Sequence, residues 1–273
     1  MRTLRTLFDF YLDASIHVGL AVTALVITSS LLLNIPVENA LLGFSFFSTI
    51  VCYNFIKYGV EAKKYLIVSK TYHRKIQVFS FLGFIPTVFF ASQLRQEVLV
   101  YIAGLGILSG LYAIPFLPKT KNLRNLAGFK IYVVALVWAG FTVLLPVVQH
   151  QSPFNWDVGV MLLQRFLLVI ILMLPFEIRD METDFKELWT IPQIIGIRGA
   201  TVLGVVLTLF FVLLTYFKDF LSVKELVSRI LLGVVLIPML LVSKKKSKYF
   251  TSFWIEAVPI FWAVSIVVLW ELS

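Results

Sequence analysis

The chain has 273 residues, of which 59% are hydrophobic and only 14% are charged. Its mean hydropathy of +0.92 lies far from the balance of a soluble domain, so the composition excludes a water-soluble globular enzyme. The single cysteine, Cys52, excludes an internal disulfide framework. The net charge is +9, but in a membrane protein the location of the charges matters more than their sum, and we expect no nucleic-acid partner.

Nine apolar segments are long enough to cross a bilayer as helices, which takes about 17–25 residues each. Asp9, Asp13 and His17 interrupt the start of the first segment, and no small-residue cleavage site follows it, so we expect a retained helix and not a signal peptide. We predict one all-α domain over residues 1–273, with nine transmembrane helices around a central cavity. The predicted spans are 12–33, 39–58, 76–93, 97–116, 129–148, 157–176, 200–217, 226–243 and 251–270.

The charges between these segments orient the chain. Most of the 24 lysines and arginines fall in segments that share one side of the membrane, and the positive-inside rule makes that side cytoplasmic. The N-terminus is then cytoplasmic and the C-terminus outside. We expect the protein in a bacterial inner membrane, with its active site facing the cytoplasm. The longest polar stretches, 59–75 and 177–199, both lie inside after an even-numbered helix. This placement indicates two loops closing over a cavity that faces the cytoplasm.

The most informative stretch runs from Glu177 to Lys186, where six charged side chains follow directly on an apolar run. Ionisable groups at a membrane boundary are costly to place and are functional candidates for that reason. Asp180 and Asp184 are four residues apart, so on a helix they share a face with Cβ atoms about 6 Å apart. Two carboxylates at this spacing suit Mg²⁺, which binds oxygen ligands and commonly bridges to phosphate. The alternative is a polar loop that only ends the helix.

Three segments together resemble one family of membrane enzymes. The sequence Glu177-Ile-Arg-Asp-Met-Glu-Thr-Asp184, followed by Thr190-Ile-Pro-Gln-Ile-Ile-Gly196, is similar to the second aspartate-rich motif of the UbiA superfamily of intramembrane prenyltransferases, and most similar to the branch that makes menaquinone precursors. Leu111-Tyr-Ala-Ile-Pro115-Phe-Leu-Pro-Lys119 resembles the family's Tyr…Pro…Lys loop after the fourth helix. Tyr72-His-Arg74-Lys75 lies where members carry a basic residue. With the nine helices, the resemblance covers nearly the whole chain.

This resemblance implies a Mg²⁺-dependent transfer of a prenyl group from a prenyl diphosphate to a small aromatic acceptor, of the kind that becomes a quinone, beside membrane lipid. Mg²⁺ and basic side chains must neutralise the leaving diphosphate, while apolar walls hold the isoprenoid tail and exclude water. Asp180 and Asp184 are the expected metal ligands. The expected catalytic residues are Asp180, Asp184, Glu61 and Lys57, and the expected diphosphate-binding residues are Arg74, Lys119, Lys186, Asn54 and Tyr58.

The first aspartate-rich motif of the family is altered in this chain. The family has Asn followed by Asp four and eight residues later, where this sequence has Asn54, Tyr58 and Ala62. Glu61 shares a helix face with Asn54 and Tyr58, and lysines crowd the same segment. Three outcomes are open: Glu61 ligates a weakened second metal site, the lysines neutralise diphosphate beside one metal, or the protein binds an isoprenoid or lipid without catalysis.

A secondary transporter is the other class of protein to weigh. Transporters also carry ionisable groups within membranes, commonly at the interface of internal repeats near the bilayer midplane. Here the carboxylates gather at one edge of the membrane, and nine helices do not divide into equal repeats. Transport is therefore the less favoured function. The sequence indicates no particular oligomeric state.

Three further polar features are candidates for a role in the cavity. Asp9, Asp13 and His17 recur at intervals of four residues, which fits either a metal-binding face or a wetted helix start. Arg165 lies deep in the sixth span, where it could face the cavity and pair with an acidic group or reach the outer interface; we favour a structural role. Glu256, at the inner end of the last span, could face the cavity or the lipid headgroups.

Overall fold

The computed structural model describes residues 2–36, 38–58, 71–113, 128–182, 188–243, 247 and 249–271. Every regular element in these ranges is a helix, which confirms the predicted all-α class. In chain order the elements are α1 (Arg2–Asp13), α2 (Ile16–Leu32), α3 (Asn39–Tyr58), α4 (Thr71–Ala91), α5 (Gln96–Ala113), α6 (Lys130–Ala139), η4 (Gly140–Leu144), α7 (Leu145–Gln149), α8 (Trp156–Asp180), α9 (Ile191–Leu213), η6 (Leu214–Phe217), α10 (Val223–Val242), η8 (Phe250–Ile255) and α11 (Glu256–Glu271).

The number of membrane spans agrees with the sequence. Among the described residues, eight helical segments are long and apolar enough to cross a membrane, and the bent pair α1 and α2 supplies a ninth. The bend of 52° falls at Ser15, whose φ of 60° lies in the left-handed region and interrupts the helix. The chain is a multi-pass integral membrane protein.

The seventh span begins earlier than predicted. Helix α9 starts at Ile191 because Thr190 and Gln193 form a capping box at its N-terminus. Gly196 then interrupts the helix with φ 73° and ψ 168°, a conformation that glycine tolerates and other residues rarely adopt. The charge of Arg198 made this first part of the helix look like a polar loop in the sequence. The polar stretch after α8 is therefore shorter than it appeared.

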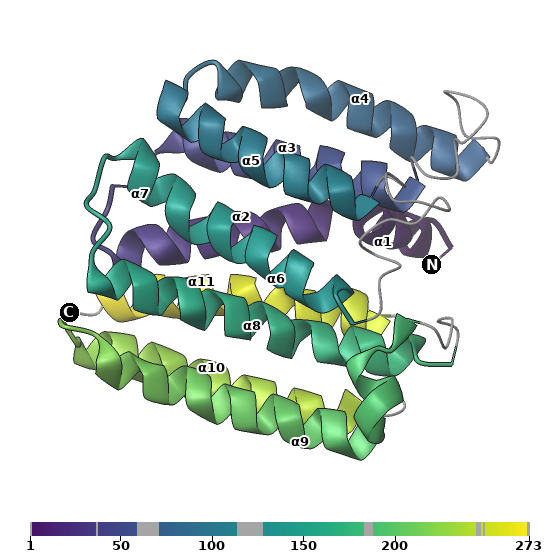
Figure 1. The fold of residues 1–273 in the computed structure, drawn as a ribbon. Helices are drawn as coiled ribbons and strands as arrows, with labels where there is room; N and C mark the ends of the chain where they lie inside the picture. Colours follow the sequence, from purple (N-terminus) through teal and green to yellow (C-terminus); the bar gives the residue numbers. More distant parts are fainter. Residues whose placement is uncertain are drawn as a thin grey trace.

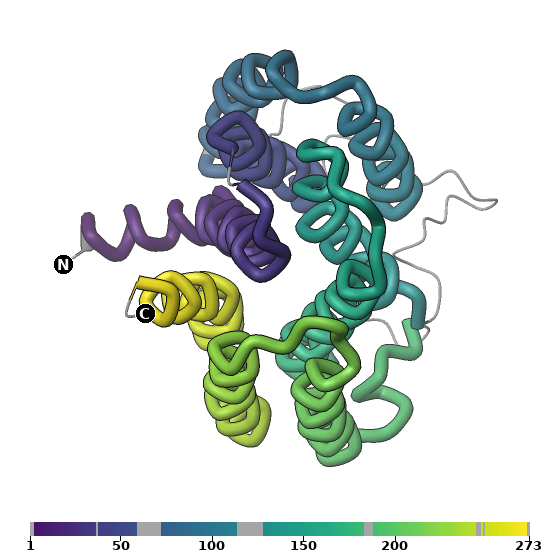
Figure 2. The backbone as a smooth tube through the Cα atoms, turned by 90° about the vertical axis from the view of Figure 1, so that its left-hand side faces the viewer, coloured from purple at the N-terminus to yellow at the C-terminus, as the bar shows by residue number. Residues whose placement is uncertain are grey.

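The spans form a ring, which Figure 2 shows along the helix axes. Helices α2, α3 and α4 pack in that order on one side, and α5, α6, α8, α9, α10 and α11 follow one another on the other side. Helix α11 packs against α2 and closes the ring. The N-terminus and the C-terminus lie at opposite ends of the bundle (Figure 1), as an odd number of spans requires.

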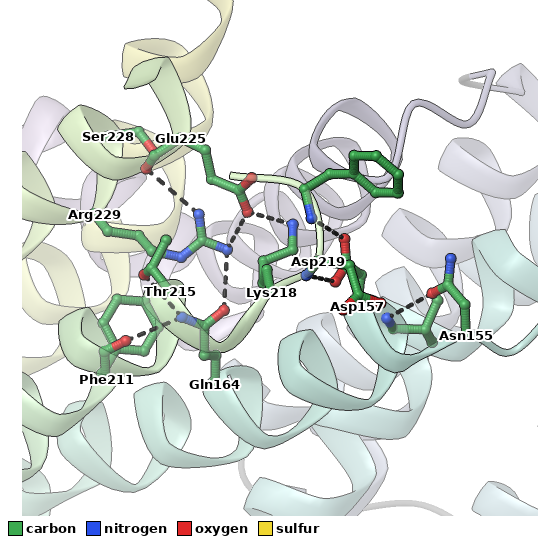
Figure 3. A network of polar contacts seen from close by, with 12 residues as sticks. Asn155, Asp157, Gln164, Phe211, Thr215, Lys218, Asp219, Glu225, Ser228 and Arg229 are labelled. Carbon is green, nitrogen blue, oxygen red and sulfur yellow. Dashed lines mark hydrogen bonds and ion pairs between the residues drawn. The ribbon is translucent and has the colours of Figure 1, made fainter. Parts of the chain in front are cut away.

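A buried polar network fastens the end of the bundle that is opposite the N-terminus (Figure 3). Lys218 and Arg229 both contact the Glu225 carboxylate, at 2.6 and 2.8 Å, and none of the three side chains is more than 4% exposed. Gln164 of α8 accepts a hydrogen bond from Arg229 at 3.0 Å and donates one to the Phe211 carbonyl at 3.0 Å. The network therefore joins α8 to α9 and α10.

Arg165 is also buried, and it has the structural role favoured above. Its guanidinium donates to the Leu25 carbonyl at 3.0 Å, to the Thr142 hydroxyl at 3.1 Å and to the Ser29 hydroxyl at 3.0 Å. It also lies 5.4 Å from the centre of the Trp262 ring, a distance that allows a cation–π interaction. These contacts tie α8 to α2, η4 and α11. Arg165 is absent from the described residues that line the cavity below.

Candidate active site: a two-part cavity inside the ring

A cavity of about 590 Å³ lies inside the ring, between α2, α3, α5, α6, α8 and α11. Its volume is typical of sites for small molecules. Charged side chains line one part, and aliphatic and aromatic side chains line the rest. The structure therefore confirms the central cavity that the arrangement of polar loops predicted.

The charged part collects residues from helix ends at one end of the bundle. Asp13 ends α1, Lys57 lies one residue before the end of α3, Lys130 begins α6 and Asp180 ends α8, and all four line the cavity. Glu256 adds a carboxylate from the first residue of α11. Neighbouring helices run in opposite directions (Figure 1), so the last residues of some helices meet the first residues of others.

The apolar part extends from this charged end into the membrane. On α8 the lining runs from Asp180 back to Val169, which is about 16 Å at the rise of an α-helix. Trp138 is the deepest lining residue on α6, and its indole Nε1–H donates to the Tyr53 hydroxyl of α3 at 2.7 Å. The cavity thus suits a ligand that has an anionic head and a hydrocarbon tail.

Asp180, one of the two expected metal ligands, lies at the cavity and contacts the residue beside it. Arg179 donates from Nε to Oδ1 at 2.6 Å and from Nη2 to Oδ2 at 2.8 Å. Arg179 also donates to the Thr251 hydroxyl and lies over the Phe176 ring. The same guanidinium lines the cavity. Arg179, a cation that can bind an anionic ligand in the cavity, therefore contacts Asp180, the candidate metal ligand.

Glu177, at the other end of the same motif, has a structural contact. Its side chain is 2% exposed, and its Oε2 accepts a hydrogen bond from the backbone N–H of Ile191 at 3.2 Å. Because the first N–H groups of a helix have no partner within it, this carboxylate helps to satisfy the start of α9. Glu177 thus holds α8 and α9 together across the residues that separate them.

Two residues of the altered first motif reach the cavity, and one does not. Lys57 and Tyr58 line it; Lys57 donates to the Ser15 hydroxyl at 2.9 Å and Tyr58 donates to the Asp13 carbonyl at 3.1 Å. Asn54 is 3% exposed and lies behind them, beside a smaller pocket of about 230 Å³.

The Asn54 amide is occupied by contacts within the protein. It accepts from the Ser15 hydroxyl at 2.8 Å and donates to the Ala14 carbonyl at 3.0 Å and to the Ser80 hydroxyl at 2.9 Å. These three bonds connect α3 to the bend between α1 and α2 and to α4. The structure therefore gives Asn54 a place in helix packing, which a sequence motif by itself does not reveal.

The remaining expected site residues divide into two groups. Arg74 is exposed in the first turn of α4 and is absent from the described cavity lining. Tyr72, two residues earlier, donates to the Asp13 carboxylate at 3.1 Å and so reaches toward the charged part. Glu61, Lys119, Asp184 and Lys186 lie outside the described residues.

The stripe of Asp9, Asp13 and His17 does not form a metal-binding face. The bend at Ser15 separates its members, and each has a different partner. Asp9 accepts from the Tyr249 hydroxyl at 2.6 Å, while the His17 ring contacts the Tyr11 hydroxyl at 2.6 Å and the Phe253 carbonyl at 2.9 Å. These side chains instead attach α1 and α2 to η8.

Lys130, Arg179 and Glu256 are cavity residues that were not among the expected site residues. Arg179 lies within the charged motif, so the motif could have suggested it. Lys130 only appeared as a basic residue at the start of a span, whereas Glu256 was expected to face either the cavity or the lipid headgroups, and it lines the cavity. Nothing in their own segments indicates that they face the same space as Asp180.

The donor chemistry at the charged end fits a divalent cation. Asp180 offers carboxylate oxygens of the kind that Mg²⁺ prefers, and the cations around it suit an anion that such a metal would bridge. In the part of the chain that the structure describes, no three His, Cys, Asp or Glu side chains gather as a metal-binding group. The second expected ligand, Asp184, lies outside that part.

Fold and cavity together define a helical membrane protein with an amphiphilic internal site, and solved structures share this architecture. A UbiA homolog from Aeropyrum pernix K1 matches with a TM-score of 0.66 at 17% identity, over 93% of this chain and 98% of that one. A UbiA homolog from Archaeoglobus fulgidus bound to GPP and Mg²⁺ matches with a TM-score of 0.60 at 12% identity, over 96% and 99%. Digeranylgeranylglyceryl phosphate synthase matches with a TM-score of 0.55 at 14% identity, over 98% of both chains.

These likenesses show that the chain has the fold of the UbiA homologues over nearly its whole length. No protein-family model matches the chain, and no curated protein matches its sequence. The fold expected from the charged motif and the nine spans is therefore confirmed by structure, although the sequence identity to these structures is only 12% to 17%.

Proposed function

We propose that this protein is a UbiA-type membrane prenyltransferase that moves a prenyl group from a prenyl diphosphate to a small aromatic acceptor. The observation that carries the proposal is the two-part cavity within a UbiA fold. Its charged part lies where helix ends meet and its apolar part runs into the membrane. A prenyl diphosphate has one chemical half for each part.

The charged part supports binding of diphosphate by cations together with one metal. Lys57, Lys130 and Arg179 line the cavity and can neutralise the negative charge that develops on a leaving diphosphate. Asp180, with Asp184, would hold Mg²⁺, which supplies further neutralisation of that charge. Lys57 lies where the family motif is altered, so an ammonium group takes a place beside the diphosphate that a carboxylate-bound metal would otherwise serve.

The apolar part supports the isoprenoid tail. Val134, Val137, Val169, Leu172 and Trp138 line it and present no charge. Such walls exclude water, which would otherwise capture an allylic carbocation. The gathering of most basic residues at the charged end favours a cavity that opens to the cytoplasm. The acceptor is then a cytoplasmic aromatic compound, consistent with a role in quinone formation in a bacterial inner membrane.

An assay in liposomes tests the proposal. Purified protein is given prenyl diphosphates of increasing length, Mg²⁺ and dihydroxynaphthoate, and diphosphate release and prenylated product are measured. We expect release to stop with EDTA and to be lost in Asp180→Ala and Asp184→Ala. The matched control is Asp219→Ala, an exposed carboxylate at the opposite end of the bundle, which should retain activity. Failure of the wild-type protein to bind any prenyl diphosphate would contradict the proposal.

A non-catalytic isoprenoid-binding protein is the second candidate. Two observations favour it: Tyr58 stands where the family has an aspartate, and Arg179 already engages both oxygens of Asp180. This candidate predicts that prenyl diphosphates bind and that no diphosphate is released with any acceptor. The same assay, read beside a binding isotherm, separates the two candidates.

A further inference from the structure

Glu256 is a cavity carboxylate that the charged motif does not include. It is the first residue of α11 and directly follows the π-helix η8, and its side chain lines the cavity with Ser252 and Pro259 of the same segment. A π-helical turn is rare and occurs often at functional sites, because its wider turn redirects the side chains that follow it. The turn here places an acidic side chain inside a membrane protein.

The other carboxylates at this end of the cavity have partners. Asp180 is held by Arg179, Glu177 by the backbone N–H of Ile191, and Asp13 by the Tyr72 hydroxyl. In the described part of the chain, the Glu256 carboxylate makes no hydrogen bond and no ion pair; only the charges of Lys57 and Arg179 act on it from a distance. The Glu256 oxygens face the cavity without a partner from the described residues, so they are free to accept hydrogen bonds from a ligand there.

The groups around Glu256 limit what that ligand can be. Lys57 of α3 and Arg179 of α8 are the cations that face it, and Tyr53 of α3 and Tyr11 of α1 are the hydroxyl groups close enough to feel its charge. Among the described residues, no other carboxylate is close enough for its charge to act on Glu256, whereas a metal ion would be shared between several acidic ligands. The surroundings suit a neutral or weakly acidic hydrogen-bond donor.

A prenyl diphosphate cannot be that donor. Its head consists of negatively charged oxygens that accept hydrogen bonds, and its tail is hydrocarbon, so a carboxylate offers it only repulsion. The donor must therefore belong to the second substrate. The assignment of the donor to the second substrate rests on the proposed prenyl transfer. It places the acceptor in the part of the cavity beside Glu256.

We propose that Glu256 binds the acceptor through an acidic hydroxyl group and takes the proton of that hydroxyl during transfer. The bond from C1 of the prenyl group to the diphosphate oxygen breaks, and its electron pair leaves with diphosphate. A new bond forms between C1 and the acceptor, at the hydroxyl oxygen or at the ring carbon that this oxygen activates. The hydroxyl proton passes to the Glu256 carboxylate. When the bond forms at the ring carbon, the hydrogen on that carbon then moves to the acceptor oxygen as the ring becomes aromatic again, so on either route one proton is lost to Glu256 and charge and atoms balance. The acceptor class is a phenol or an enol.

The test compares Glu256→Gln with the wild-type protein and with Glu271→Gln, a matched variant at the exposed far end of the same helix. Two acceptor probes are used: dihydroxynaphthoate, and dimethoxynaphthoate, which has the same shape without the hydroxyl donors. Binding of each probe is measured by quenching of tryptophan fluorescence, and binding of a prenyl diphosphate with Mg²⁺ is measured by calorimetry.

We expect the wild-type protein and Glu271→Gln to prefer the dihydroxy probe, and Glu256→Gln to lose this preference while it still binds the prenyl diphosphate. Where transfer occurs, kcat should fall about 100-fold in Glu256→Gln, the effect expected from loss of a general base. Glu256→Asp should recover part of it, and this variant also serves if the glutamine variant does not fold.

Three results would overturn the inference. They are an unchanged preference for the dihydroxy probe in Glu256→Gln, a loss of prenyl diphosphate binding in place of acceptor discrimination, and a wild-type protein that does not distinguish the two probes. A wild-type protein that distinguishes the probes but transfers no prenyl group contradicts the proposed function and leaves the acceptor site intact. The two failures are therefore distinguishable.

Discussion

The carboxylate of Asp180 is held on both oxygens by the guanidinium of its neighbour Arg179, at 2.6 Å and 2.8 Å. A charge-assisted pair of two parallel hydrogen bonds is among the stronger polar contacts in proteins. Arg179 also reaches Thr251 of η8 and lines the cavity. A metal ion and this guanidinium therefore compete for one pair of oxygens, and a bound diphosphate offers Arg179 another partner.

Arg179→Gln tests this competition. Removing the guanidinium should strengthen binding of Mg²⁺ alone, because Arg179 no longer competes for the two Asp180 oxygens. It should also weaken prenyl diphosphate binding about 10- to 100-fold, since a charged hydrogen bond contributes about 1.5–3 kcal/mol. Calorimetric titrations measure both affinities, and the exposed Arg198→Gln on α9 is the control. A loss of both affinities together would show that Arg179 supports the metal site and does not compete with it.

Trp138→Ala should change the length of prenyl chain that the cavity accepts. Trp138 is the deepest lining residue on α6, and its hydrogen bond to Tyr53 fixes the ring across the apolar part. Removing the indole opens space beyond it, so longer prenyl diphosphates should bind better relative to short ones. Competition binding across a length series measures the shift. The control is Trp254→Ala, at a side chain that is 56% exposed, and it should leave the relative affinities unchanged. Unchanged relative affinities in Trp138→Ala would mean that the prenyl tail does not lie against Trp138.

Asn54→Ala separates a packing role from a role in diphosphate binding. The amide makes three hydrogen bonds to Ala14, Ser15 and Ser80, and leaving buried polar partners unsatisfied costs about 1–3 kcal/mol. We expect a lower unfolding temperature in detergent and an unchanged affinity for prenyl diphosphate. Gln93→Ala, an exposed amide, is the stability control. A fall in affinity without a fall in unfolding temperature would restore Asn54 to the diphosphate site.

Glu225→Gln should destabilise the protein strongly. Its carboxylate contacts Lys218 and Arg229 in a buried network, and breaking a buried ion pair from one side costs about 3–5 kcal/mol because the remaining charges lose their partner. The exposed pair of Arg95 and Glu97 is the comparison, and Glu97→Gln should lower the stability far less because water already screens this pair. Thermal unfolding of both variants in the same detergent measures the difference. Equal losses of stability in the two variants would mean that water screens the charges around Glu225 as it does those around Glu97.

Much of the architecture followed from local properties of the chain. The thickness of a bilayer requires about 20 apolar residues for each span, so hydropathy alone located nearly every helix. The boundaries were wrong where a helix contained a charge or a bend. Helix α9 begins earlier than predicted because Thr190 caps it, and Gly196 then bends it. The first span also begins earlier, because α1 precedes α2 across a bend at Ser15, whose left-handed conformation no local pattern indicated.

The candidate site divided in a similar way. The i, i+4 spacing predicted that Asp180 and Asp184 share a helix face, but α8 ends at Asp180 and Asp184 lies outside the described residues, so this stays a prediction. The resemblance in the same segment indicated the fold that the structure then showed. Lys57 and Tyr58 reach the cavity, whereas Asn54, on the same helix, points into packing contacts. A helix has a fixed relation between its own residues, but its rotation about its axis is set by its neighbours.

The sequence by itself therefore determined that this is a nine-span helical membrane protein with an acidic motif at one membrane edge, because hydropathy and helical spacing are local properties. Only the tertiary structure decided that Lys130 and Glu256, which lie 126 residues apart, line the same cavity as Asp180. It also decided that Arg179 holds the Asp180 carboxylate while Glu256 makes no hydrogen bond within the described residues. Packing between distant helices brings these charges together, and no pattern within a single segment encodes that packing.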